Sequence, residues 1–225
     1  MKDLITIGLP SKGRLKDRAI SFFNESGYKI LQSEKERNYF GTIENEPNIK
    51  IIFLHAKEII QRLGDGTLDL GVSGLDLLKE SDKNLQNKIN IQKKLDFGNA
   101  NLVVAVPDDW IDVQTIADLE EISFDIRFKR NSRLRVATKY PNLTNDFLIS
   151  KGVTQYKLIP SLGATETYPF IGSSEIITDI TSTGKTLADN NLRALKDGLI
   201  LSSNACLFIA KKKTAKLQPF LKSLV

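Results

Sequence analysis

The stretch EIITDITSTGKTL, residues 175–187, carries the pattern on which the fold prediction rests. It begins with β-branched residues that are typical of a strand, passes through Ser-Thr-Gly, and runs into residues that favour a helix. Apolar segments of strand length alternate with helical patterns in this way along the whole chain. The alternation predicts an α/β fold with mostly parallel sheets.

Eight segments have the length and composition of strands. They are residues 4–9, 49–56, 69–74, 102–107, 134–140, 156–160, 175–180 and 205–210. Seven segments have helical patterns, and they are residues 14–26, 57–62, 75–79, 113–119, 144–150, 186–195 and 214–224. The apolar positions 217, 220, 221 and 224 of the last segment have helical spacing.

The pattern divides near the midpoint, where residues 102–107 end in Pro-Asp-Asp-Trp. We therefore expect two lobes, each with a mostly parallel sheet, and an active site in the cleft between them, where pockets tend to form. The last strand is expected to return to the first lobe, and the last helix to pack on it. The predicted lobes are residues 1–99 plus 196–225 and residues 100–195.

The composition restricts the class of protein. The chain of 225 residues is 41% hydrophobic, carries a net charge of +5, and has one cysteine and one histidine. A disulfide within the chain is excluded, a zinc site is disfavoured, and a cytoplasmic location is expected. No apolar run reaches the roughly 18 residues of a membrane span. The basic clusters at 127–135 and 211–213 lack interleaved aromatic residues, so we interpret them as solvated surface or a subunit interface, not a nucleic-acid site.

The turn at residues 182–184 admits two interpretations. Free backbone N–H groups, hydroxyl groups and the positive end of a helix together favour an anion site. A strand-to-helix turn with threonine as N-cap explains the same residues without any ligand. Two nucleotide-binding motifs are excluded: Asp179 stands where the Walker A motif needs its first glycine, and Asp69 where GxGxxG needs its third.

The order of a carboxylate followed by TGxT resembles the phosphoribosyl pyrophosphate (PRPP) motif of phosphoribosyltransferases. Five segments together resemble the catalytic subunit of ATP phosphoribosyltransferase, in its short form, from histidine biosynthesis. They are LPSKGRL (9–15), GTLDLGVSGLDLL (66–78), RVATKYPNL (135–143), SLGATETYP (161–169) and EIITDITSTGKTLADNNL (175–192). They occur in the order of the family and cover most of the chain.

The resemblance implies a two-lobed fold like that of periplasmic binding proteins. It implies attack by N1 of the adenine of ATP on C1 of PRPP, with magnesium, to give phosphoribosyl-ATP and pyrophosphate. It further implies self-association as a dimer and a regulatory subunit related to histidyl-tRNA synthetase, usually in a hetero-octamer. The alternative is a non-catalytic binding module for a phosphorylated ligand, with the same fold.

The resemblance also implies the residues of the site. On the PRPP side they are Glu166, Glu175, Asp179, Thr181, Ser182, Thr183, Gly184, Lys185 and Thr186. Magnesium is expected to be held by the substrate phosphates, near Glu166 or Asp179. On the ATP side they are Lys12, Gly13, Arg14, Asp69, Gly71, Ser73 and Gly74. The catalytic cations are expected to be Lys12, Arg14, Arg37 and His55.

Two positions depart from the pattern of the family. His55 begins His-Ala-Lys-Glu where many members have the pattern R-A-x-D, so either His55 or Lys57 replaces the arginine, or His55 only caps the end of a strand. Glu175 stands where aspartate is more frequent. Cys206, within ACLFIA, is interpreted as a small buried apolar residue, not a nucleophile.

Overall fold

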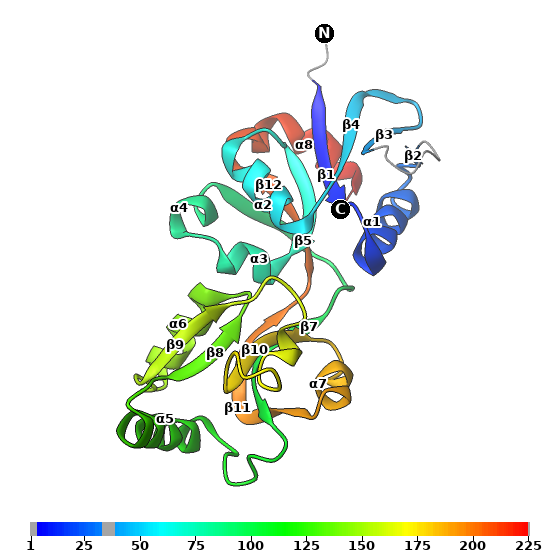
Figure 1. The fold of residues 1–225 in the computed structure, drawn as a ribbon. Helices are drawn as coiled ribbons and strands as arrows, with labels where there is room; N and C mark the ends of the chain where they lie inside the picture. Colours follow the sequence, from blue (N-terminus) through cyan, green and yellow to red (C-terminus); the bar gives the residue numbers. More distant parts are fainter. Residues whose placement is uncertain (1–3, 33–38, 225) are drawn as a thin grey trace. The chain divides into compact units, whose positions relative to one another are not determined.

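The computed structural model describes residues 4–32 and 39–224. The chain forms two compact units: unit 1 comprises residues 1–98 and 204–225, and unit 2 comprises residues 99–203. Each unit combines one sheet with helices, which confirms the α/β class. Figure 1 follows the chain from blue to red and shows the last strand among the early strands of unit 1.

Unit 1 contains a seven-stranded sheet in the order β2-β3-β4-β1-β5-β12-β6. Its strands are β1 (Ile5–Pro10), β2 (Ile30–Gln32), β3 (Phe40–Ile43), β4 (Glu46–Leu54), β5 (Leu70–Gly74), β6 (Ile89–Lys94) and β12 (Ala205–Ala210). Its helices are α1 (Gly13–Glu25), α2 (Ala56–Asp65), α3 (Leu75–Glu80), α4 (Lys83–Gln86) and α8 (Thr214–Leu224), with a 3₁₀ turn at Lys211–Lys213.

Unit 2 contains a five-stranded sheet in the order β11-β7-β10-β8-β9. Its strands are β7 (Ala100–Pro107), β8 (Leu134–Thr138), β9 (Tyr156–Pro160), β10 (Ile176–Thr181) and β11 (Leu192–Ser203). Its helices are α5 (Ile116–Arg130), α6 (Pro141–Ser150) and α7 (Lys185–Asp189), with a 3₁₀ turn, η1, at Thr165–Thr167.

Both sheets are mixed, so the expectation of mostly parallel sheets is wrong. In unit 1, β1 runs parallel to β4 and β5, whereas the other pairs are antiparallel. In unit 2, β8 runs parallel to β9 and β10, whereas β7 is antiparallel to β10 and β11. The parallel pairs arise from strand–helix–strand segments. The antiparallel pairs come from hairpins and from strands that enter a unit late in the chain.

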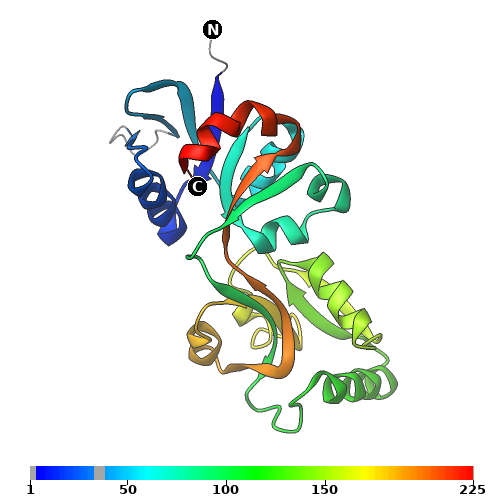
Figure 2. The same ribbon diagram turned by 180° about the vertical axis from the view of Figure 1, so that it is seen from behind.

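Helices cover both faces of each sheet. In unit 1, side chains of α1 and α8 pack with β1 and β4 on one face, and side chains of α2 and α3 pack on the other. The last helix therefore packs on unit 1 as predicted, because Leu217, Phe220, Leu221 and Leu224 belong to the first of these cores. In unit 2, α5 and α6 cover one face, and α7 lies on the other, as Figure 2 shows from behind.

One predicted helix is helical only in its first half. The helix expected over residues 186–195 ends at Asp189, and β11 begins at Leu192. Asn191 adopts a left-handed φ of 52°, a conformation that asparagine tolerates better than most residues and that ends the helix. The following residues pair with β7, and the register shifts between Ala194 and Leu199, so that Leu192, Leu195 and Gly198 are buried. Leu192, Leu195 and Leu199 are spaced by three and four residues, as on one face of a helix, so the local spacing favoured a helix here.

The basic cluster at 127–135 lies largely at the end of α5 and in the turn that follows. Arg127, Lys129 and Arg130 are exposed, and Lys129 pairs with Asp125 at 2.6 Å within the helix. Solvated surface and subunit interface both remain compatible with this exposure. Within the described residues, none of the helices combines the length and apolar character that a membrane span needs.

Candidate active site

Three parallel strands of unit 2 end at the same edge of the sheet. β8 pairs with β10 so that Thr138 lies opposite Thr178, and with β9 so that Thr138 lies opposite Pro160. The segments that follow therefore leave the sheet side by side: Lys139 after β8, Ser161 after β9, and the loop at residues 182–184 after β10. The carboxyl ends of parallel strands are the usual place for a ligand in α/β proteins.

Asp179 is the central carboxylate at this edge. It lies in β10, and its Oδ1 accepts a hydrogen bond of 2.8 Å from the N–H of Ile180. Burial raises the pKa of Asp179 above the ordinary value of 3.8, and the nearby carboxylate of Glu166 raises it further. Lys139 and a hydrogen bond from the hydroxyl of Thr165 oppose this rise in the pKa. Asp179 is thus a half-buried acceptor whose charge is compensated only in part.

The TGxT loop presents backbone and hydroxyl groups to solvent. Gly184 is the N-cap of α7 at a φ of 75°, and its N–H donates to Thr181 Oγ1 at 2.8 Å. A Cβ at Gly184 would meet nothing within 4 Å, so the requirement for glycine comes from φ and not from space. Within residues 4–32 and 39–224, the N–H groups of Ser182 and Thr183 find no acceptor.

This arrangement differs from an ordinary capped turn. The N-cap is glycine and makes no side-chain cap bond, so the interpretation with threonine as N-cap is wrong. Thr183 Oγ1 accepts weakly from the N–H of Lys185 at 3.4 Å, and Ser182, Thr183, Lys185 and Thr186 are exposed. Free N–H groups, hydroxyl groups and one lysine at a helix start suit an oxyanion such as a phosphate.

Glu175 does not lie with these residues. It precedes β10, whereas the loop follows it, so Glu175 belongs to the opposite edge of the sheet. Its carboxylate accepts two hydrogen bonds from Arg135, one of 2.6 Å from Nη2 and one of 2.7 Å from the backbone N–H. The backbone N–H of Glu175 in turn donates to the carbonyl of Arg135. This position separates Glu175 from the loop, and its contacts with Arg135 fix the starts of β8 and β10.

We expect Glu175→Gln to reduce stability and to leave PRPP binding unchanged within about twofold. The substitution removes the charge that Arg135 pairs with, and this guanidinium is partly exposed, so the loss of unfolding free energy should be about 1–2 kcal/mol. Urea denaturation and a PRPP titration measure the two effects. A tenfold loss of PRPP affinity at unchanged stability would contradict the structural role.

The expected cations of unit 1 that the structure describes lie at the carboxyl ends of β1 and β4. These strands are parallel, Pro10 lies opposite Leu54, and the N–H of Ser11 donates to the carbonyl of Leu54 at 2.8 Å. Lys12 is the N-cap of α1 and makes no side-chain cap bond, and Gly13 has a φ of 72°. Lys12 and Arg14 are exposed, and no ion pair joins either of them to another described residue.

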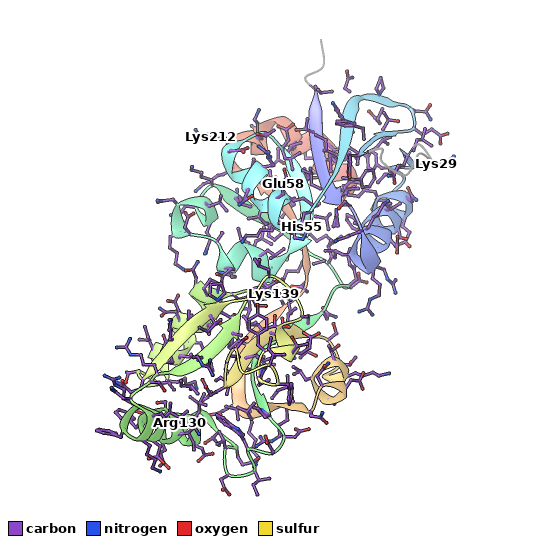
Figure 3. The ribbon with its side chains drawn as sticks, viewed as in Figure 1. Lys29, His55, Glu58, Arg130, Lys139 and Lys212 are labelled. Carbon is purple, nitrogen blue, oxygen red and sulfur yellow. The ribbon has the colours of Figure 1, made fainter. Side chains whose placement is uncertain are left out.

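His55 follows β4 and is therefore a neighbour of this cationic turn. It is the N-cap of α2, and its Nδ1 accepts from the N–H of Lys57 at 3.3 Å (Figure 3). The structure thus shows that His55 caps the start of a helix, and not merely the end of a strand. Its exposed imidazole leaves Nε2 open for an anion, so a phosphate role stays a prediction. Arg37 lies outside the described residues.

Capping and catalysis at His55 can be separated by substitution. We expect His55→Ala to lower the unfolding free energy by about 0.5–2 kcal/mol, and His55→Asn, a strong N-cap, to retain stability. Thermal denaturation measures this difference. The turnover of His55→Asn then separates the two roles, because the variant keeps the cap and loses the imidazole. Equal stability of the alanine and asparagine variants would contradict the capping role.

Three expected ATP-side residues are held inside the fold. Asp69 precedes β5 at the amino edge, and its Oδ2 accepts from both the N–H and the hydroxyl of Thr6 at 2.8 and 3.0 Å. Ser73 is fully buried and donates to the carbonyl of Ala56 at 2.8 Å. A Cβ on Gly71 would lie 2.6 Å from Ile59 Cγ2, so this glycine permits close packing of α2.

These positions give three of the residues expected on the ATP side a structural role. The buried contacts of Asp69, Gly71 and Ser73 hold strands and helices together, which sets them apart from the exposed candidates. Gly74 is half-buried at the carboxyl end of β5, the same edge as Lys12, and remains a candidate. Glycine spacing in the sequence could not separate the residues that face a ligand from those that face α2.

Cys206 is buried in β12 among the side chains of α2 and α3. Burial raises the pKa of its thiol to about 11, so the thiol stays protonated at neutral pH. This confirms the prediction of a small buried apolar residue. Among the described residues, cysteine and histidine thus supply no paired nucleophile and base.

Comparison with known proteins separates an enzyme from a binding module. The HisG family model, described as ATP phosphoribosyltransferase, matches residues 55–225. The ATP phosphoribosyltransferase of Chelativorans sp. (strain BNC1) is 48% identical over 210 residues, which cover 93% of this chain and 91% of that protein. The chain belongs to the ATP phosphoribosyltransferase family. The alternative of a non-catalytic binding module is therefore not favoured.

Solved structures confirm the expected fold of an ATP phosphoribosyltransferase. The HisG:HisZ complex of Thermotoga maritima contains a chain with a TM-score of 0.74 at 24% identity, covering 98% of this chain and 96% of that chain. A substrate-binding protein of an amino acid ABC transporter has a TM-score of 0.56 at 12% identity, covering 98% and 91%. At these identities the likeness concerns the fold alone, which is the two-lobed fold of periplasmic binding proteins.

Asp179 and Glu166 are the candidate carboxylates for a magnesium ion in this enzyme. Asp179 and Glu166 are close enough for the charge of one to raise the pKa of the other, and a cation between them would relieve that repulsion. No cluster of three or more potential metal-binding side chains occurs among the described residues. One or two carboxylates together with substrate phosphates is the usual set of ligands for magnesium.

Two residues beside Asp179 were not predicted from the sequence. Lys139 lies within the quoted segment RVATKYPNL but received no role, although it directly follows β8 (Figure 3). Thr165 is fully buried, and its hydroxyl lies 2.9 Å from that of Ser161. The position directly after a buried parallel strand was the signal for Lys139. Figure 3 also shows Arg130, in the basic cluster, far from Lys139 within unit 2.

Proposed function

We propose that this chain transfers the phosphoribosyl group of PRPP to N1 of the adenine of ATP, with magnesium, and releases pyrophosphate. Its family makes it a phosphoribosyltransferase that acts at the first step of histidine biosynthesis. The observation that carries the proposal is the pairing of a half-buried carboxylate with an open phosphate loop at one sheet edge. Asp179 offers acceptors to ribose hydroxyls, and the loop offers donors to the 5′-phosphate.

The roles of the loop follow from its geometry. The N–H groups of Ser182 and Thr183, with the first N–H groups of α7, are directed donors for a phosphate. The hydroxyl of Thr186 and the ammonium of Lys185 add a further donor and a charge. Glu166 and Asp179 are the carboxylates that would hold magnesium near the ribose, and the metal would supply neutralisation of pyrophosphate charge.

Unit 1 supplies the cations for the second polyanion. We assign Lys12 and Arg14, with Gly13 and Gly74 beside them, to the phosphates of ATP or the leaving pyrophosphate. His55 or Lys57 adds a donor at the neighbouring strand end. In the reaction the lone pair of adenine N1 forms the bond to C1 of PRPP. The C1–O bond breaks at the same time, and the electron pair of that C1–O bond leaves with pyrophosphate. Positioning and charge neutralisation suffice, so no covalent nucleophile is needed.

We further propose that the enzyme is cytoplasmic and works with a regulatory subunit. The solved complex from Thermotoga maritima pairs the structural neighbour with a second protein, HisZ. A histidyl-tRNA-synthetase-like subunit in a hetero-octamer, around a dimer of this chain, is the assembly that the family resemblance implies.

The test is formation of phosphoribosyl-ATP by the purified chain. ATP, PRPP, magnesium and pyrophosphatase are supplied with and without the candidate regulatory subunit, and product is followed by absorbance or chromatography. We expect turnover that changes when the subunit is added. Binding of PRPP without product under either condition would contradict the catalytic proposal, and absence of PRPP binding would contradict the assignment of the loop. The same assay without magnesium and with a chelator tests whether the reaction requires the metal.

A further inference from the structure

Three threonines form a closed ring of hydroxyl groups behind the candidate PRPP site. Thr178 Oγ1 donates to Thr138 Oγ1 at 2.6 Å, and Thr144 Oγ1 lies 3.1 Å from Thr138 Oγ1 and 2.7 Å from Thr178 Oγ1. The three side chains are at most 1% exposed. They come from β8, α6 and β10, so the ring joins two strands and the helix that follows the first of them.

The donors in the ring can be assigned by counting protons. Each hydroxyl has one proton, and that of Thr178 is donated to Thr138. Thr144 must therefore donate to Thr178, and Thr138 must donate to Thr144. Thr138 Oγ1 also accepts a hydrogen bond of 2.9 Å from the N–H of Tyr140. Every hydroxyl proton is thus used once, and all three bonds run in the same direction around the ring.

The ring directly precedes both charged residues of the candidate site. Thr138 is followed by Lys139 and Thr178 by Asp179, and the two threonines are opposite each other in the parallel pair of β8 and β10. Alternation along a strand directs Thr178 and Asp179 to opposite faces of the sheet. The N–H of Tyr140 lies just beyond Lys139, so the bond to Thr138 shapes the turn that carries this lysine.

We propose that the Thr138–Thr144–Thr178 ring is a positioning device that sets the spacing between Lys139 and Asp179 for PRPP binding. The inference rests on the proposed PRPP site of unit 2. Neither charged residue touches the ring through its own side chain in any described contact, so the effect acts through the backbone. Loss of one hydroxyl leaves a buried partner unsatisfied and lets the two strand ends shift. Misplacement of binding groups by about 1 Å is enough to lose roughly 100-fold in rate.

Thr144 is the residue to substitute, because it lies on α6 and is not adjacent to a charged site residue along a strand. Thr144→Val keeps the shape and removes the hydroxyl, and Thr144→Ser keeps the hydroxyl. Ser123→Ala is the matched control: Ser123 is fully buried in the same unit, and its hydroxyl donates at 2.7 Å to Glu120 of its own helix. PRPP affinity, kcat, and KM for PRPP and for ATP are measured well below the melting temperature of each variant.

We expect Thr144→Val to weaken PRPP binding at least tenfold with KM for ATP within twofold of the wild type. Thr144→Ser should restore PRPP affinity to within about threefold, and Ser123→Ala should lower the melting temperature without changing PRPP affinity. If Thr144→Val binds PRPP like the wild type, the proposal is overturned. It is also overturned if Ser123→Ala loses as much PRPP affinity, since the effect is then one of general destabilisation.

A folding failure of Thr144→Val does not end the test. Thr144→Ala introduces no new group, and its comparison with Thr144→Ser isolates the hydroxyl with the same expected tenfold difference. The wild type is the reference for the proposed function. If it binds no PRPP, the assignment of unit 2 fails and the role of the ring with it; if it binds and the valine or alanine variants bind equally well, only the ring proposal fails.

Discussion

Asp179→Asn is expected to weaken PRPP binding by roughly 100-fold, equivalent to about 2.7 kcal/mol, and to raise the stability of the unliganded protein at neutral pH. Hydrogen bonds from ribose hydroxyls to a charged acceptor are stronger than those to a neutral amide. Asparagine keeps an oxygen for the N–H of Ile180, so the local backbone should be retained. Isothermal titration with PRPP and thermal denaturation measure the two effects.

The gain in stability depends on pH in a definite direction. Burial raises the pKa of Asp179 in the folded state above its ordinary value of 3.8. A raised carboxylate pKa means that the folded state binds its proton more tightly than the unfolded state, so stability is lost as pH rises through the folded pKa. The asparagine variant avoids this loss. Its advantage over the wild type should therefore be present at pH 7 and shrink as pH falls towards 4.

Asp189→Asn is the control, because Asp189 lies exposed at the end of α7 in the same unit. It should change neither PRPP affinity nor the dependence of stability on pH. PRPP affinity of Asp179→Asn within threefold of the wild type would contradict the ribose-binding role. A variant less stable than the wild type at pH 7 would contradict the electrostatic cost of the buried carboxylate.

Lys139→Met is expected to weaken PRPP binding by about 10- to 50-fold, with KM for ATP unchanged. The substitution removes a cation from the carboxyl end of β8, where it acts on Asp179 and, in the proposed site, would act on the phosphates of PRPP. It also removes the charge that lowers the pKa of Asp179, so that pKa should rise further. The acidic limb of the pH profile of kcat/KM for PRPP should accordingly move to higher pH.

Two comparisons separate charge from structure at Lys139. Lys139→Arg keeps the cation and should retain most of the affinity, and Lys157→Met removes an exposed lysine from β9, away from its carboxyl end. The double variant Lys139→Met with Asp179→Asn tests whether the two residues act together. Additive losses would mean that they bind separate parts of PRPP, and less than additive losses would show coupling. Unchanged PRPP affinity of Lys139→Met would contradict its place in the site.

Strong periodic segments were predictable from the sequence, and weak ones were not. β12, with the sequence ACLFIA, is buried at every position because its side chains alternate between two cores. Its apolar run was sufficient to predict a strand. β2, β3 and β6 were missed, since they lie at or near the edges of their sheet and are short or carry exposed polar residues. β11 was missed because Asn190-Asn191 was read as part of a helix.

Two of the carboxylates predicted for the site lie at the opposite edge of their sheets from the loops that follow the strands. Asp69 and Glu175 are both carboxylates in segments shared with the family, yet each directly precedes a strand and belongs to the amino edge of its sheet. Asp179 lies near the carboxyl end of β10, where the loop begins. Identity with a motif did not distinguish these positions. The direction of the strand does, because amino and carboxyl ends of parallel strands lie at opposite edges.

The sequence by itself determined the α/β class and the family. Asp179 and the TGxT loop lie within a few residues of one another, so a contiguous motif of the family was enough to predict them as candidate site residues, whereas local chemistry alone left a capped turn open. Only the tertiary structure brought Lys139, Thr165 and Glu166 to Asp179, and closed the hydroxyl ring across β8, α6 and β10. Strand pairing joins Thr138 to Thr178 across 40 residues. Such contacts depend on the order and the register of the strands in the sheet. The burial of whole faces of the sheet decides both, and no local segment of the sequence contains this information.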